Sequence, residues 1–144
     1  MRLLIICPLL FISCQIQSEK QTPAGKLGTA GELPADFIEF YQRFHDDSVY
    51  QLEHIQFPLS GLPANADTME TSAGTFKWKQ SNWKIHKPID STLTGYVKSF
   101  RKFDDGVIIE IITQRQVGIG MERRFVKMDG NWQLIYYAGM NYLL

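Results

Sequence analysis

The chain contains few of the residues from which small scaffolds and metal sites are built. Its 144 residues include only two cysteines and three histidines. Two cysteines cannot form a disulfide scaffold or a four-thiolate zinc site, and no pair of histidines has the spacing of metal ligands. Net charge is also absent, since 15 lysines and arginines balance 15 aspartates and glutamates. We therefore expect no metal, no cofactor and no nucleic-acid partner.

Catalytic and nucleotide-binding motifs are missing as well. The sequence has no Gly-x-Ser-x-Gly elbow and no phosphate loop, and Gly118-x-Gly120 lacks the third glycine and the following helix of a dinucleotide site. With 44% hydrophobic and 21% charged residues, the chain is still long enough to bury an ordinary core. These features predict a domain that binds or assists another molecule and is not an enzyme.

The longest apolar run lies at the N-terminus. Residues 3–12 form a run of ten, too short to span a bilayer as a helix but typical of a signal peptide. A small residue and a cysteine, Ser13-Cys14, end the run as in a bacterial lipobox, from which Phe11 departs because leucine is usual there. We expect cleavage of residues 1–13 and a lipid anchor on Cys14. An ordinary secretory signal with an incidental cysteine is the alternative.

Residues 14–33 predict a flexible tether, because glutamine, serine, threonine, glycine and alanine dominate them. They lack the acidic cluster that some bacteria place after the lipidated cysteine to send lipoproteins to the cell surface. The expected location is therefore the cell envelope, anchored in the membrane by the lipid and facing the periplasm. Residues 34–144 remain as one folded domain.

The folded part begins with a helical pattern. Aromatic residues recur at i, i+3, i+4 and i+7, which puts four rings on one core-facing stripe: Phe37, Phe40, Tyr41 and Phe44. Residues 46–48 interrupt this helix and cap a second short helix, which ends by Phe57-Pro58. We expect a surface loop over residues 60–73, with room for a short edge strand.

Strand patterns fill the rest of the chain. Two short strand-like pieces are expected within residues 75–87, joined at 80–82, and longer strands at 94–103, 107–112, 121–128 and 132–138. The 107–112 strand is nearly all β-branched, which predicts a central position covered on both faces. The predicted class is α+β, with an N-terminal helix or helix pair packed into a strongly bent antiparallel sheet.

The turn at Asp129-Gly130 leaves the register of the last hairpin open. A two-residue turn would place Phe125 opposite Leu134 and Arg123 opposite Tyr136. A bulged three-residue turn would instead pair Val126 with Trp132 and Arg124 with Leu134. The sequence therefore leaves open whether Arg123 or Arg124 faces inward.

Several motifs resemble a bacterial lipoprotein family known only as a domain of unknown function, with a nuclear-transport-factor-2-like, cystatin-like cone fold. They are Asp36-Phe37-x-x-Phe40, Phe44-x-x-Asp47, Val49-Tyr50-Gln51-Leu52, Ile55-Gln56-Phe57-Pro58-Leu59, and the tail Glu122-Arg123-Arg124-Phe125-x-x-x-Asp129-Gly130-x-Trp132-x-Leu134. The resemblance covers residues 36–137. It implies a cone whose helix and concave sheet enclose a pocket, and it implies no catalytic residue.

A lone acid marks the candidate pocket. Glu110 is the only charge among residues 107–112, so it should be paired, protonated or facing water. The simpler interpretation is an ion pair between Glu110 and either Arg123 or Arg124. One alternative is that the arginine binds an anionic ligand. Another is an isomerase- or dehydratase-like enzyme in which Glu110 is the base. The candidate pocket residues are Tyr41, Glu110, Arg123, Arg124 and Tyr136.

A lysine- and tryptophan-rich segment is the second candidate site. Tryptophan faces suit sugar stacking and lysines suit anionic polymers, which makes a glycan-binding module a further alternative, carried by Trp78, Trp83, Lys77 and Lys79. A solvated strand pair with two core-facing tryptophans is the simpler interpretation. The expected partner is thus a small molecule, a glycan or another envelope protein.

Overall fold

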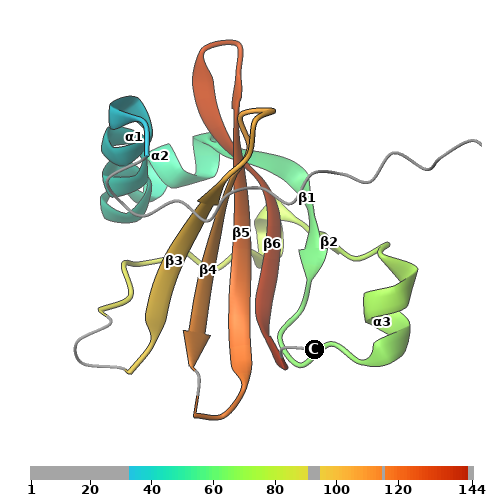
Figure 1. Cartoon of the computed structure of the whole chain (residues 1–144). Coiled ribbons are helices and arrows are strands. Elements are labelled where there is room, and N and C mark those ends of the chain that lie inside the picture. Colours follow the sequence, from blue (N-terminus) through green and yellow to red (C-terminus); the bar gives the residue numbers. More distant parts are fainter. Residues whose placement is uncertain (1–32, 91–94, 115, 143–144) are drawn as a thin grey trace, which may run out of the picture.

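The computed structural model describes residues 33–90, 95–114 and 116–142 (Figure 1). The predicted signal peptide, Cys14 and all but the last residue of the tether lie outside the described residues. Within these ranges, three helices, a short 3-10 turn and six strands follow one another: α1 (Ala35–Asp46), α2 (Ser48–Glu53), β1 (Ile55–Leu62), α3 (Thr68–Ala73), β2 (Lys77–Trp78), η2 (Gln80–Asn82), β3 (Val97–Lys102), β4 (Ile108–Gln114), β5 (Ile119–Met128) and β6 (Asn131–Tyr142).

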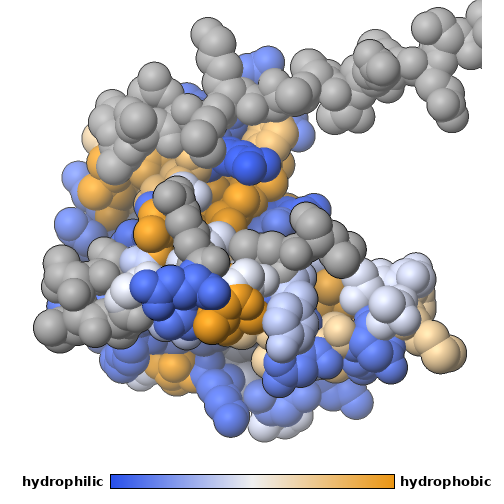
Figure 2. All heavy atoms as spheres, turned by 60° about the horizontal axis from the view of Figure 1, so that its bottom comes forward, coloured by the Kyte–Doolittle hydropathy of each residue, from blue (hydrophilic) through white to orange (hydrophobic). Residues whose placement is uncertain are grey.

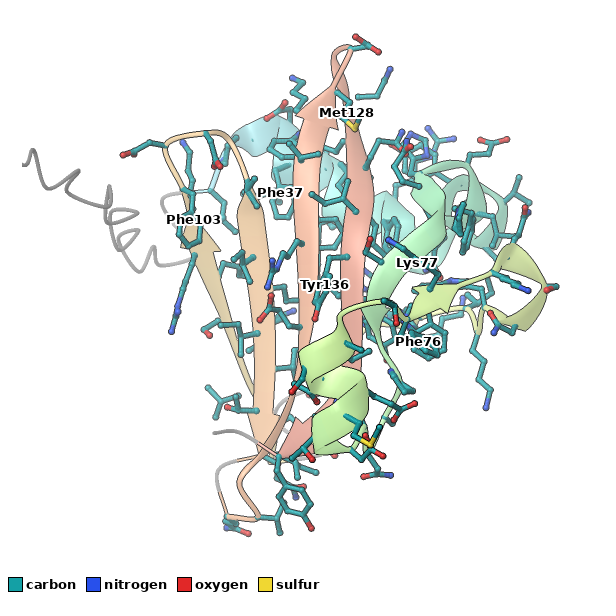
Figure 3. All side chains as sticks on the ribbon, turned by 90° about the vertical axis from the view of Figure 1, so that its right-hand side faces the viewer. Phe37, Phe76, Lys77, Phe103, Met128 and Tyr136 are labelled. Carbon is teal, nitrogen blue, oxygen red and sulfur yellow. The ribbon has the colours of Figure 1, made fainter. Side chains whose placement is uncertain are left out.

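The strands form one curled sheet in the order β2-β1-β6-β5-β4-β3. Helix α1 packs on one face of this sheet, and Figure 3 looks onto the other face with α1 behind the strands. The predicted α+β class, with a helix pair against a bent sheet, is confirmed. One pair differs from the antiparallel expectation: β1 runs parallel to β6, because it enters the sheet from α2 at the end where β6 begins, with Ile55 beside Leu134.

The aromatic stripe of α1 forms the core, as predicted. Phe37 and Phe44 are fully buried and Phe40 is 5% exposed. Their rings surround Phe125 of β5 at centroid distances of 5.5–5.8 Å, in edge-on geometry. The second helix also follows the prediction, because the Asp47 carboxylate caps α2 by accepting two backbone N–H bonds of 3.0 Å.

Two segments differ from the prediction. Residues 55–62 form strand β1, whereas the sequence predicts that the second helix continues until Pro58. Ile55 and Leu59 of this strand are buried and Pro58 is exposed, so the proline interrupts no core contact. The expected loop at 60–73 contains helix α3, which a reciprocal capping box between Asp67 and Glu70 stabilises.

The segment after β2 is another difference. Only Lys77–Trp78 pairs as a strand, with β1. The expected second piece at Trp83 is not a strand, because η2 turns the chain and the residues after it bind a buried side chain of α2. The predicted positions of β3 and β4 are confirmed. Strand β4 is interior, between β3 and β5.

The last hairpin has a two-residue turn followed by a bulge. Asp129 and Gly130 have φ values of +49° and +83°, the left-handed geometry of a tight hairpin turn. Phe125 then lies opposite Leu134, as the two-residue register predicts. The next pair is shifted, because β6 contains one extra residue, Ile135, at that point.

The bulge corrects one predicted pair, and the two-residue register decides which arginine faces inward, because Arg123 lies two residues from the buried Phe125 on β5. Arg123 lies opposite Tyr137, and the expected Arg123–Tyr136 pair does not form because Tyr136 has moved opposite Arg124. Arg123 is 2% exposed and points to the face covered by α1. The neighbouring Arg124 therefore points to the outer face.

Candidate functional site

A buried ion pair joins two neighbouring strands on the inner face of the sheet. Glu110 of β4 and Arg123 of β5 are register partners, and the guanidinium donates to the carboxylate over 2.7 Å. The two side chains are 1% and 2% exposed. The prediction that one of the two arginines pairs with Glu110 holds for Arg123. A pair so deeply buried is held by its mutual attraction and by further hydrogen bonds.

Helix α1 supplies the third member of this cluster. The Tyr41 hydroxyl donates to the other oxygen of Glu110, so both carboxylate oxygens have partners within the protein. Burial, and then the charge of Glu110, raise the pKa of Tyr41 far above its usual value. The hydroxyl therefore keeps its proton and remains a donor at all ordinary pH values.

Two histidines accept further hydrogen bonds from Arg123. Its Nε donates to His86 Nδ1 over 3.2 Å, and its NH1 group lies 3.3 Å from His45 Nε2. His45 Nδ1 lies 2.8 Å from the Tyr41 carbonyl oxygen, which fixes Nδ1 as a donor and leaves Nε2 as the acceptor toward Arg123. Both rings are therefore neutral.

The electrostatics of the cluster agree with this assignment. Burial, then the Arg123 cation and then His45 lower the pKa of His86 to about 2. Burial and Arg123 also lower the pKa of His45, against the hydrogen bond to the Tyr41 carbonyl. The sequence favours satisfied or solvated histidines but gives no sign that two of them share one arginine.

A buried glutamine fixes the segment that carries His86. Gln51 of α2 is fully buried and donates to the carbonyls of Phe44 and His86 at 2.6 and 2.9 Å. Its amide oxygen accepts from the backbone N–H of His86 at 2.8 Å and from the Trp83 indole at 3.2 Å. Sequence reasoning missed this residue, since a glutamine in a short helix gives no local signal of burial.

A pocket of about 400 Å³ adjoins the cluster between α1 and β3, and we call it the α1–β3 pocket. Tyr41 and His45 belong to both the pocket wall and the buried cluster. The remaining described lining residues are Leu33, Phe37, Ile38, Gln42, Asp46, Pro88, Lys98 and Phe100. The aromatic stripe thus fills the centre of the concave sheet, and open space remains beside it.

Two of the predicted pocket residues lie elsewhere. Arg124 and Tyr136 are on the outer face, where the guanidinium lies 4.3 Å from the Tyr136 ring centroid and pairs with Glu122 at 2.5 Å. Tyr136 is labelled on this face in Figure 3. Successive residues of a strand point to opposite sides, so Arg123 and Arg124 cannot share one pocket. Of the five predicted residues, Tyr41, Glu110 and Arg123 come together.

The tryptophans of the candidate glycan surface are partly buried. The Trp78 indole donates to the Tyr137 carbonyl at 3.0 Å, and the Trp83 indole to Gln51. Their rings pack edge-on at 6.1 Å, next to Tyr137. Lys77 and Lys79 are exposed, and the Lys77 ammonium donates to Ser60 at 2.5 Å. Because both indole N–H groups are used internally, these rings act as core-flanking side chains.

A second hollow of about 280 Å³ lies between α1, α2 and the β5–β6 turn. Three of the four charged residues in its described lining have partners: Lys127 pairs with Asp36 at 2.6 Å, and the Arg43 guanidinium lies 4.1 Å from the centroid of the Tyr50 ring. On the face seen in Figure 2, hydrophobic surface is interrupted by hydrophilic side chains. None of the helices in the described ranges has the length and hydropathy to cross a membrane.

Comparison with known proteins identifies a family. A family profile described as "Domain of unknown function (DUF4348)" matches residues 29–139. A crystal structure described as an ntf2-like protein from Bacteroides fragilis aligns with 71% of this chain at 16% identity and a TM-score of 0.47, and the aligned part spans 45% of that protein. No curated protein matches the chain. Since the profile covers well over half of the sequence, the chain belongs to this domain family of unknown function.

Proposed function

We propose that this protein is a lipid-anchored binding or accessory domain of the bacterial cell envelope that faces the periplasm and holds a small ligand in the α1–β3 pocket. The observation that carries the proposal is the pocket itself. Its volume of about 400 Å³ falls within the range of small-molecule sites, and its wall combines aromatic rings with a few polar groups.

The buried cluster supports binding over catalysis. A general base must reach the proton that it removes from a substrate. Both oxygens of Glu110 are already bonded, one to Tyr41 and one to Arg123, and the two histidines accept from Arg123. Proton transfer to a substrate would require these bonds to break in a dry site. The cluster is instead suited to holding Tyr41 and His45 in fixed positions along the pocket wall.

One observation favours the alternative of an isomerase- or dehydratase-like enzyme. Tyr41 lines the pocket and is directly bonded to Glu110, which places a proton relay within one hydrogen bond of a bound molecule. An enzyme of this kind would lose its activity in Tyr41→Phe while keeping its ligand affinity. A binding domain would show no turnover of its ligand in either form.

Occupancy of the pocket is the direct test. Ile38 lines the pocket and is 40% exposed, so Ile38→Trp should fill the space without disturbing the core. Native mass spectrometry of the full chain purified from bacterial membranes should detect a bound small molecule that Ile38→Trp lacks. Val49→Trp is the matched control, because Val49 is 65% exposed on α2 and is not among the described lining residues. A ligand retained by both variants, or absent from the unchanged chain, contradicts the proposed site.

The anchor has its own test. Cys14 is the residue that we expect to carry the lipid, because the lipoprotein signal ends directly before it. Metabolic labelling with a fatty-acid analogue should mark the unchanged chain and leave Cys14→Ser unlabelled. Cys7→Ser, within the expected signal peptide, is the control and should be labelled normally. Label that persists in Cys14→Ser contradicts the anchor.

A further inference from the structure

The α1–β3 pocket has an asymmetric charge. Among its described lining residues, Lys98 is the one cation and Asp46 the one acid. His45 also lines the pocket, but its ring is neutral because Nε2 faces the Arg123 guanidinium and Nδ1 donates to a carbonyl. In the described part of the wall, a bound molecule would therefore meet positive charge at Lys98.

The position of Lys98 follows from the alternation of strand β3. Phe100 is buried against α1, and Lys98, two residues earlier, shares that face. Because β3 is an edge strand, Lys98 remains exposed although it faces inward. Its ammonium group lies 5.2 Å from the centroid of the Tyr41 ring and 6.0 Å from that of Phe100. No salt bridge to Lys98 is formed within the described part of the chain.

Apart from Gln42 and His45, the remaining described wall is mostly apolar. Phe37, Tyr41 and Phe100 pack against one another at centroid distances of 5.4–6.1 Å, and all three line the pocket. Leu33 and Ile38 extend this surface. Such a wall favours a ligand with a hydrocarbon or aromatic body, since burying apolar area is the main favourable contribution that it can make.

We infer that the pocket binds a small carboxylate with an apolar body, the body against the rings and the carboxylate on the Lys98 ammonium. This inference rests on the proposed function and names the ligand class of the same site. One lysine supplies one compact charge and three donors, which matches a monoanion. A phosphate would call for an arginine fork or several backbone donors, and Asp46 would repel its second charge.

The test uses three probes with the same ring system and different charge: 1-naphthoate, 1-naphthalenemethanol and 1-naphthylmethylamine. Equilibrium dialysis of the full chain, in nanodiscs with empty nanodiscs as the blank, gives an affinity for each probe. Naphthoate should bind about tenfold more tightly than the alcohol, and the amine more weakly than both. Equal affinity for all three probes would overturn the ligand class.

Variants then locate the charge. Lys98→Gln should weaken naphthoate binding about tenfold and leave the alcohol unchanged. Lys102→Gln is the matched control, since Lys102 is exposed on the same face of β3 and is not among the described lining residues. Asp46→Asn should strengthen naphthoate binding a few-fold by removing a repulsive charge. Equal losses in Lys98→Gln and Lys102→Gln would refute the contact.

The two proposals fail in different ways. If Ile38→Trp abolishes binding of the alcohol but Lys98→Gln changes no affinity, the pocket binds ligands and only the carboxylate assignment is wrong. If no probe binds, or Ile38→Trp leaves every affinity unchanged, the α1–β3 pocket is not the binding site and both proposals fall. A loss for naphthoate alone in Lys98→Gln supports both.

Discussion

Replacement of Glu110 by glutamine tests the buried cluster most directly. The change keeps the size of the side chain and removes its charge. Arg123 is 2% exposed, and in the variant its cation would face two neutral imidazoles and a neutral amide. The Tyr41 hydroxyl, which donates to Glu110, would also meet either a weaker acceptor or the amide NH₂ group. The variant therefore leaves a buried charge without compensation.

The expected cost follows from the burial of both partners. Removing one member of a buried ion pair costs about 3–5 kcal/mol, because the other charge stays desolvated. For a folded region of this size, that loss lowers Tm by about 10–25 °C. Thermal melts followed by circular dichroism, together with urea denaturation, measure both quantities. Glu122→Gln is the control: its pair with Arg124 is 30% and 44% exposed, so its loss should stay below about 1 kcal/mol.

A melt of Glu110→Gln at or above that of the unchanged chain would refute this reasoning. It would mean that the carboxylate is held at a cost to the fold, as functional acids often are, and would favour the enzyme alternative. A double variant separates charge from packing. Glu110→Leu with Arg123→Met should recover much of the stability that Glu110→Gln loses, because the pair is then replaced by apolar side chains of similar size.

Three further predictions concern the core, the sheet and acid. Phe40→Ala should cost about 3–5 kcal/mol in denaturant melts because the ring is 5% exposed, and a loss below about 1 kcal/mol would contradict the aromatic stripe. Gly61→Ala should destabilise the fold more than Gly74→Ala, because a Cβ at Gly61 would lie 1.8 Å from a backbone oxygen of β6. A Cβ at Gly74 would meet open space, so Gly74→Ala should cost only the roughly 1 kcal/mol of an alanine in left-handed backbone. The free energy of unfolding should fall by about 1.4 kcal/mol for each pH unit below about 6.5. The reason is that His86 takes up a proton in the unfolded chain at that pH, whereas the folded chain, in which its pKa is about 2, keeps it neutral. Urea titrations from pH 7.5 to 4.5 give the free energy of unfolding at each pH. This free energy should fall less steeply with acid in His86→Asn, whose amide can accept from Arg123. An equally steep fall in both proteins would show that His86 is not the group responsible.

Local spacing in the sequence was sufficient for the parts of the fold that depend on neighbouring residues. The four-ring stripe predicts α1, because the four aromatic residues recur with the 3.6-residue period of a helix. Asp47 predicts the start of α2 through its capping side chain, and Asp129-Gly130 predicts a tight turn. The missed helix α3 also had a local signal, the Asp67-x-x-Glu70 capping box, within a segment whose composition resembles a loop.

The centre of the site depends on contacts between distant parts of the chain. Glu110 could be singled out as a lone charge in an apolar strand, but its partner is set by the register of β4 against β5, in which Glu110 lies opposite Arg123, and no local pattern predicts that register. His86 lies 37 positions from Arg123, and Gln51 lies 35 positions from His86. Such contacts are fixed by how α2 and the segment after η2 dock on the sheet, so a sequence read along its length cannot supply them.

The shared residues explain why a charged cluster in the core is relevant to a pocket at its side. Tyr41 and His45 are one turn apart on α1 and each has one side toward the pocket and one toward the Glu110–Arg123 pair. Because the pair fixes the hydroxyl and the imidazole by hydrogen bonds, the pocket wall is set before any ligand arrives, which lowers the ordering cost of binding. The same bonds occupy both oxygens of Glu110 and the hydroxyl proton of Tyr41. A cluster that fixes the wall and binds both oxygens of its own carboxylate fits the proposed binding domain, and Lys98 is then the cation that the described pocket lining offers to a ligand.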